Sequence, residues 1–333
     1  MIKYFLNTIE TGHSFFVASN NMKQQKAFIA KHLEPFIAEA KTSNDGSLDA
    51  EDFKKIELYG LTIPAMLGEA FCVLRGRKMT DKERMSITFL ASITGLFDDL
   101  FDKKDLPESY IQNLLDSPYT HTVANSNESL LIQLYFLGLE LSDKQDIVKS
   151  YALDVYNAQV SSQRQKRGDL TREEIQQITF DKGGLSMPLY RCAFGGDIDE
   201  IEYKLLYYLG AIGQLENDIF DVYKDYISKI QTLVTTETDI ATLRTTYLQL
   251  RDKIMALIEQ QSYNSRNKRR FKTFANLVIC RGLIGLDLLE KNANRTQGVF
   301  SIDKYDRKDL ICDMESPRNV LKLLHYASLC DKK

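Results

Sequence analysis

Two stretches, FDDLFD at 97–102 and QLENDIFDVYKD at 214–225, decide the fold and the chemistry of this chain. Each places an acidic cluster in an otherwise apolar helical run, where a carboxylate lacks solvation of its own and needs a cation. Residues four apart share one face of a helix, so Asp98 lies with Asp102, and Asn217 lies with Asp221 and Asp225. The sequence therefore predicts two faces of oxygen ligands.

Carboxylates at this spacing repel one another, by about 4 kcal/mol at 4 Å for an effective dielectric constant near 20. The repulsion disappears if a divalent cation lies between the oxygens. Carboxylate and amide oxygens without nearby His or Cys suit Mg²⁺, which often shares substrate phosphates as ligands. We interpret the two stretches as a clamp for metal ions and a diphosphate.

The first stretch resembles the Asp-Asp-x-x-Asp motif of the class I isoprenoid synthase superfamily, which includes terpene synthases and trans-prenyltransferases. Asp98, Asp99 and Asp102 match its three positions. One such motif occurs often by chance. A second acidic helical motif 120 residues further on (218 minus 98) makes the signal much more specific.

The second stretch is a hybrid of two family patterns. Asn217, Asp218, Asp221 and Asp225 fit the spacing of the terpene synthase motif Asn-Asp-x-x-Ser/Thr-x-x-x-Glu, with Asp in the last two ligand positions. Gln214, Asp218 and Asp221 also resemble the prenyltransferase motif Gln-x-x-Asp-Asp-x-x-Asp. Asn217 occupies the position of the first Asp of that motif.

The resemblance implies a fold, a reaction and a metal requirement. The implied fold is all-α, a single domain over residues 1–333 that forms a terpenoid synthase-type helical bundle around a central cavity. The implied enzyme is a Mg²⁺-dependent terpene synthase, which ionises an allylic isoprenoid diphosphate of C10–C20 or longer and releases diphosphate plus a terpene hydrocarbon or alcohol. Three Mg²⁺ are expected, and their implied ligands are Asp98, Asp102, Asn217, Asp218, Asp221 and Asp225.

In these families a basic residue and a helix break before the second motif sense the diphosphate. Lys182 lies 36 residues before Asp218 and is followed by Gly183 and another glycine, whereas Arg172 lies 46 residues before Asp218. The adjacent glycines favour Lys182, because a glycine pair permits a helix break and a close backbone approach to a ligand. Asp98, Asp99 and Lys182 are the predicted catalytic residues.

Further substrate-binding positions follow from the same resemblance. Bacterial terpene synthases carry an Arg-Tyr pair about 80 residues beyond the second motif, and Lys304-Tyr305 occupies that region loosely. The predicted substrate-binding residues are therefore Lys182, Gly183, Arg172, Gln214, Lys304 and Tyr305.

Composition narrows the class of protein. The 333 residues are 44% hydrophobic with only six Pro, which favours one helical domain with a large core. A net charge of -3 argues against a nucleic-acid partner. Five scattered Cys indicate reduced thiols in a cytoplasm.

No uncharged run reaches the length of a membrane span. Met1 to Phe16 lacks the charged, apolar and small-residue segments that follow one another in a signal peptide. We therefore expect a cytoplasmic protein without stable membrane insertion. Oligomeric state is left open, with a homodimer as one option.

Local patterns predict where helices begin and end. Helices are expected near 22–40, 49–75 with a kink at Pro64, 205–230 and 318–330. Thr80-x-x-Glu83 and Thr171-x-x-Glu174 are capping-box signatures at helix starts. The basic run at 266–270 is interpreted as a solvated loop.

Three alternatives stay open. A chain-elongating prenyltransferase carries an Arg-Arg-Gly shortly after its first motif, and this chain has no Arg pair there; its upstream basic group, 75–78, begins 23 residues before Asp98. Squalene and phytoene synthases carry paired Asp-x-x-x-Asp motifs and are a weaker alternative. The third alternative is a non-catalytic helical scaffold, although clustered carboxylates among apolar residues argue against it.

Overall fold

The protein is all-helical, as the sequence predicts. The computed structural model describes residues 2–97, 108–118 and 120–329 of the chain, and no strand occurs among them. Asp98, Asp99 and Asp102 of the first motif lie outside the described residues.

The chain divides into two compact units, each assembled from distant segments. The first unit contains Met1–Phe15, Val160–Met187 and Ile198–Lys333, and the second contains Phe16–Gln159 and Pro188–Asp197. That the whole chain forms one domain stays a prediction.

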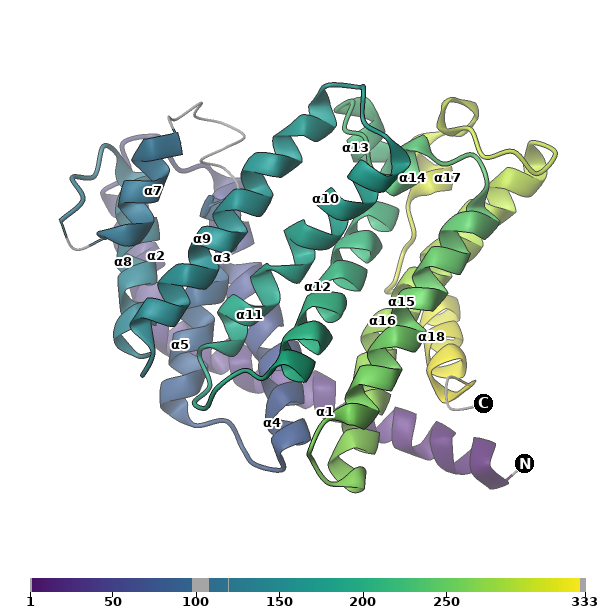
Figure 1. Cartoon of the computed structure of the whole chain (residues 1–333), viewed down its shortest axis with the longest axis horizontal. Coiled ribbons are helices and arrows are strands. Elements are labelled where there is room, and N and C mark those ends of the chain that lie inside the picture. Colours follow the sequence, from purple (N-terminus) through teal and green to yellow (C-terminus); the bar gives the residue numbers. More distant parts are fainter. Residues whose placement is uncertain (1, 98–107, 119, 330–333) are drawn as a thin grey trace. The chain divides into compact units, whose positions relative to one another are not determined.

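Helices of the second unit come mostly from the N-terminal half (Figure 1). α1 and α9 begin in one unit and end in the other, as does the short α11. The bounds are α1 Ile2–His32, α2 Glu34–Thr42, α3 Ala50–Ile63, a π-helix Pro64–Gly68, α4 Glu69–Arg75, α5 Asp81–Ser92, α7 Glu108–Asp116, α8 Ser126–Glu140, α9 Gln145–Ser162 and α11 Ser186–Arg191.

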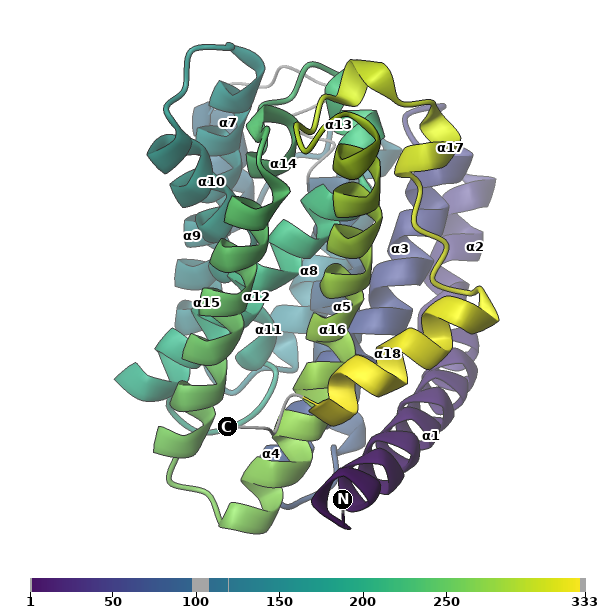
Figure 2. The same cartoon turned by 90° about the vertical axis from the view of Figure 1, so that its right-hand side faces the viewer.

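The first unit is built around α12, which packs against α10, α15 and α16, and α16 in turn packs against α18 (Figures 1 and 2). The bounds are α10 Arg172–Gly184, α12 Glu200–Phe220, α13 Val222–Ile227, α14 Leu233–Thr236, α15 Ile240–Gln260, α16 Ser265–Arg295, α17 Arg307–Leu310 and α18 Pro317–Leu329.

Both predicted capping boxes are confirmed. The Thr80 side chain accepts a hydrogen bond from the Glu83 backbone N–H, and the Glu83 carboxylate accepts one from the Thr80 backbone N–H. Thr171 and Glu174 make the same reciprocal pair at the start of α10. Each pair satisfies two backbone donors that a helix N-terminus leaves without partners.

Several predicted helix bounds differ from the structure. The helix expected at 22–40 is the end of α1 followed by α2, because Pro35 at the start of α2 cannot continue an α-helical ladder. Pro64 opens the π-helix Pro64–Gly68 within an otherwise continuous helical run. The helix expected at 205–230 is divided at Asp221 into α12 and α13.

The run Ala50–Arg75 has the length and composition of a membrane-crossing helix, with a mean hydropathy of 1.3 in its most apolar window. In the structure 44% of that window is buried, and its α3 segment packs against α5 in the second unit. Core helices of globular proteins have the same composition. It is the one such run found in the described part of the chain.

Glycines bring the backbones of α10 and α12 into contact. A Cβ placed on Gly183 would overlap the carbonyl oxygen of Gly210, and a Cβ on Gly210 would overlap that of Gly183. The pair therefore lets two helices cross more closely than any larger residue permits. The helix break that the sequence predicts at Gly183 and Gly184 is confirmed, because α10 ends at Gly184 and α11 begins at Ser186.

We expect Gly210→Ala to destabilise the protein by about 1–3 kcal/mol, because a buried contact between two backbones cannot accommodate a methyl group. Chemical unfolding followed by circular dichroism measures the change. Gly213→Ala on the same helix is the matched control, since a Cβ there meets nothing within 4 Å. It should be neutral or stabilising by up to about 1 kcal/mol. Equal effects of the two substitutions would contradict the close crossing.

Candidate functional site

The second motif occupies the junction between α12 and α13. The backbone N–H of Asp221 donates to the Asn217 carbonyl at 2.8 Å, and that of Asp225 donates to the Asp221 carbonyl at 2.9 Å. Because these bonds join residues four apart, helical register passes through the junction. Asn217, Asp221 and Asp225 consequently form one row, as the sequence predicts.

Exposure changes along this row. Asn217 is exposed, the Asp221 side chain is 36% exposed, and Asp225 is buried. Asp221 makes an ion pair with Lys224 at 3.3 Å. The row therefore runs from solvent into the interior of the first unit, with its deepest carboxylate at Asp225.

Asp218 is buried beside this row and is hydrogen-bonded on both oxygens. Gln214 Nε2 donates to its Oδ1 at 2.9 Å, and Thr179 Oγ1 donates to its Oδ2 at 3.3 Å. Burial raises the pKa of the Asp218 carboxyl to about 6, against the lowering effects of Gln214, Lys182 and Thr179. These contacts join α12 to α10 and fix the orientation of the carboxylate.

Asp225 is the most strongly perturbed carboxyl group of the row. Burial, followed by repulsion from Asp218 and Asp221, raises its pKa to about 7, while Lys224 and Lys182 act in the opposite direction. The described structure thus holds acidic groups that repel one another within a poorly solvated region. A bound cation would remove this repulsion.

Lys182 lies in the last turn of α10, on the helix that the glycine crossing presses against α12. Its charge acts on both Asp218 and Asp225, yet it forms no ion pair with a residue of the described ranges. Gly183, predicted to bind substrate, contacts Gly210 of α12, and its role in substrate binding stays a prediction. The ammonium of Lys182 is therefore available to a further anion as far as the described residues extend.

Arg172, the other candidate sensor, opens α10 and pairs with Glu237 at 3.2 Å. Ten residues of helix, about 15 Å, separate it from Lys182. Its guanidinium already has a carboxylate partner, whereas Lys182 lies among the motif carboxylates. The structure therefore favours Lys182 as the basic residue of this site.

Lys304 and Tyr305 make contacts away from the row. Tyr305 is buried, stacks on Phe300 and shares a 2.6 Å hydrogen bond with the Thr296 hydroxyl. Lys304 is exposed and lies 3.4 Å from Asp303. The following helix, α17, packs against α13.

Sequence reasoning did not identify Thr179 or Glu216. Thr179 lies three residues before Lys182, so helical spacing could have placed both on one face of α10. Glu216 is buried and pairs with Arg281 at 3.3 Å; burial raises its pKa to about 7. No local signal distinguishes Glu216 from its neighbours, because its burial depends on α16.

The donor set of the row matches the chemistry of Mg²⁺. Carboxylate and amide oxygens are hard ligands, and buried carboxylates that repel one another are the kind of site a divalent cation stabilises. Within the described ranges, no three His, Cys, Asp or Glu side chains converge closely enough to hold a metal ion by themselves. The row therefore fits part of a metal site that needs further ligands, from substrate or from elsewhere in the chain.

No protein-family model and no curated protein matches this chain. A crystal structure of a dehydrosqualene synthase in complex with ligand is similar to it, with 14% sequence identity over 83% of this chain and 96% of that chain. The TM-score is 0.48, and at that value the likeness carries no argument about this chain.

The raised pKa values give a testable pH dependence. Burial raises the pKa of Asp218 to about 6 and that of Asp225 to about 7, above the ordinary value of 3.8 for Asp, so these groups bind more protons in the folded state between about pH 4 and pH 7. With metal removed by chelator, the free energy of unfolding should fall as pH rises through that range. Asp225→Asn should flatten the fall by about 4 kcal/mol at most, because one pKa unit is worth about 1.4 kcal/mol.

Urea unfolding at several pH values in chelator measures this dependence. Glu216 contributes a similar fall, since its folded pKa is also raised, so the Asp225→Asn profile should retain part of the slope. Equal slopes of the wild type and Asp225→Asn between about pH 5 and pH 7 in chelator would contradict the assigned burial of Asp225.

Proposed function

We propose that this chain is a Mg²⁺-dependent class I terpene synthase, which ionises an allylic isoprenoid diphosphate and releases diphosphate plus a terpene hydrocarbon or alcohol. The observation that carries the proposal is the row of Asn217, Asp221 and Asp225 beside Lys182. Oxygen ligands and a basic group without a described ion-pair partner, placed together, suit a metal-bound diphosphate.

Mg²⁺, when bound, would supply Lewis-acid stabilisation of the charge that develops on the departing diphosphate. Asn217, Asp221 and Asp225 provide oxygens for the metal. Lys182 donates hydrogen bonds to the diphosphate and stabilises its charge. Asp218, fixed on both oxygens, orients the end of α10 that carries Lys182. Asp98 and Asp102 complete the proposed ligand set from the first motif, and Asp99 is a further proposed catalytic residue.

A second diphosphate site, which a chain-elongating prenyltransferase needs, has little support. The basic group at 75–78 precedes α5 in the sequence, whereas the first motif follows that helix, which is itself about 18 Å long. Arg75 donates to the Gly195 carbonyl at 3.1 Å, and Arg77 pairs with Glu83. Both guanidinium groups thus already have partners within the protein, which favours a single-diphosphate reaction.

A second candidate is head-to-head condensation of two isoprenoid diphosphates, as in squalene and phytoene synthases. Asp221 and Asp225 share a face at Asp-x-x-x-Asp spacing, with a backbone hydrogen bond that keeps them in register. Asp98 and Asp102 have the same spacing in the sequence. A non-catalytic scaffold is the weakest candidate, because repelling buried carboxylates cost stability without serving a ligand.

Incubation of the purified chain with Mg²⁺ and geranyl, farnesyl or geranylgeranyl diphosphate tests the proposal. We expect a terpene hydrocarbon or alcohol from one substrate alone, no dependence on isopentenyl diphosphate, and loss of product in chelator. Mass spectrometry of the products measures the outcome. A product with twice the carbon number of the substrate would establish the head-to-head reaction instead. Longer diphosphates formed with isopentenyl diphosphate, or inertness with every substrate, would refute both.

The role of Lys182 is tested by Lys182→Met with Arg172→Met as its matched control. Loss of one group that stabilises the leaving diphosphate should lower turnover by about 10²–10³-fold. Arg172→Met should stay within a few fold of wild type, since its partner is Glu237. Circular dichroism should be unchanged in both variants. A larger loss in Arg172→Met than in Lys182→Met would reassign the diphosphate sensor.

A further inference from the structure

The first helix, α1, has a buried face that is unusually polar. The buried positions recur at helical spacing, so they form one stripe along the helix. From residue 11 onward they are Thr11, Ala18, Asn21, Gln25 and Ile29. Polar or small side chains occupy four of these five positions, which is the reverse of an ordinary amphipathic helix.

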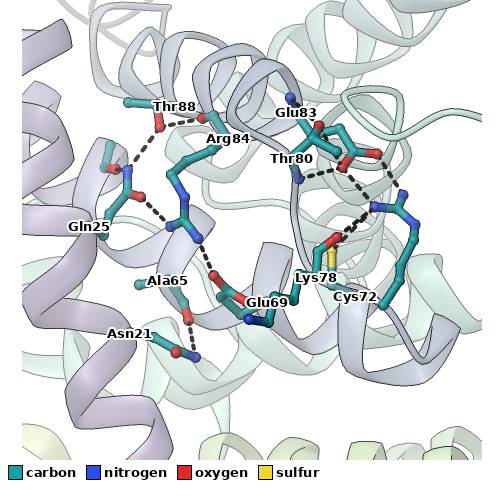
Figure 3. Close-up of polar contacts among 12 residues, drawn as sticks. Asn21, Gln25, Ala65, Glu69, Cys72, Lys78, Thr80, Glu83, Arg84 and Thr88 are labelled. Atoms are coloured by element: carbon teal, nitrogen blue, oxygen red, sulfur yellow. Dashed lines mark hydrogen bonds and ion pairs between the residues drawn. The ribbon is translucent and has the colours of Figure 1, made fainter.

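Hydrogen bonds tie the part of this polar face that belongs to the second unit to neighbouring helices of the same unit (Figure 3). Gln25 donates to the Thr88 hydroxyl at 2.8 Å and accepts from Arg84 at 2.9 Å. Asn21 donates to the Ala65 carbonyl at 3.4 Å. The helix therefore cannot roll to turn another face inward without leaving buried polar groups unpaired, each at a cost of about 1–3 kcal/mol.

The outward face of α1 carries large apolar side chains. Phe16 is 70% exposed, Ile9 is 53% exposed and Phe15 is 41% exposed. Phe16 lies on the side of the helix away from Asn21 and Gln25, in the part of α1 that belongs to the second unit. The locked polar face explains why this side chain stays in solvent in the isolated chain.

The outward surface of α1 also carries positive charge beyond Phe16. Lys23 is seven residues beyond Phe16, Lys26 is eleven beyond Phe15, and both lysines are exposed without an ion pair to any residue that the structure describes. α1 contains four Lys and one Glu, a net +3 (four minus one) before its His are counted, in a chain of net charge -3. Its single acidic residue, Glu10, pairs with Arg269 at 3.0 Å.

We propose that the outward face of the part of α1 that belongs to the second unit, defined by Phe16, Lys23 and Lys26, docks peripherally on an anionic lipid bilayer. A helix that combines exposed aromatic residues with lysines and lacks free acidic groups lies in the plane of a membrane interface. The aromatic end enters the boundary between headgroups and acyl chains, and each lysine gains about 1 kcal/mol from anionic headgroups.

Charge favours a bilayer over a second copy of the chain. A twofold contact would bring the same basic face against itself, with no free carboxylate on α1 to complement the lysines. The proposal requires no membrane-crossing segment and holds independently of the reaction that the chain catalyses.

Co-sedimentation of the full-length chain tests the proposal, using vesicles of phosphatidylcholine with and without a quarter of phosphatidylglycerol. We expect binding to the anionic vesicles at low salt and release at high salt. Phe16→Ser should weaken binding roughly tenfold, because it removes the phenyl ring whose apolar surface would be buried in the bilayer. The double variant Lys23→Glu and Lys26→Glu should weaken binding at least as much and remove the preference for anionic lipid.

Leu58→Ser is the matched control, since Leu58 is 55% exposed on α3. It should bind like wild type, and all variants should keep wild-type circular dichroism because the changed side chains are exposed. Absence of binding by wild type, or equal binding by Phe16→Ser, would overturn the proposal. A dimer in light scattering that Phe16→Ser converts to monomer, without vesicle binding, would assign this face to self-association and overturn it as well.

Discussion

The backbone contact between Gly183 on α10 and Gly210 on α12 is the constraint on which the site depends. A side chain at either position would separate the two helices, since its Cβ would meet the opposite carbonyl oxygen. At this close distance Thr179 reaches Asp218, and the charge of Lys182 acts on Asp218 and Asp225. Because Gly183 and Gly210 have no side chains, Lys182 on α10 comes close enough to act on the carboxylates of Asp218 and Asp225.

Burial gives the carboxylates of this region their chemical character. Asp218 satisfies both oxygens by hydrogen bonding, whereas Asp225 combines burial with repulsion from its acidic neighbours. A protein without a cationic ligand would be more stable with apolar residues at such positions. Retention of charge where it costs stability is the physical argument for a metal-dependent role, and it is independent of any resemblance.

α1 illustrates how a polar core contact can determine a surface. Gln25 and Asn21 fix the rotation of the helix, so the opposite side, with Phe16, faces outward. Sequence periodicity alone would assign the apolar side of α1 to the core, whereas in the structure this side faces outward. A helix with one polar face suits the peripheral docking proposed here. Insertion across a membrane needs a continuous apolar span instead.

The sequence by itself determined whatever depends on near neighbours along the chain. Capping boxes at Thr80 and Thr171 and the shared face of Asn217, Asp221 and Asp225 follow from helical spacing, and the all-helical class follows from composition. Only the tertiary structure decided that Thr179 binds Asp218, that Gly183 contacts Gly210 of another helix, and that Tyr305 is buried. These outcomes depend on segments far apart in the sequence, and local periodicity carries no information about which distant helix will cover a given face.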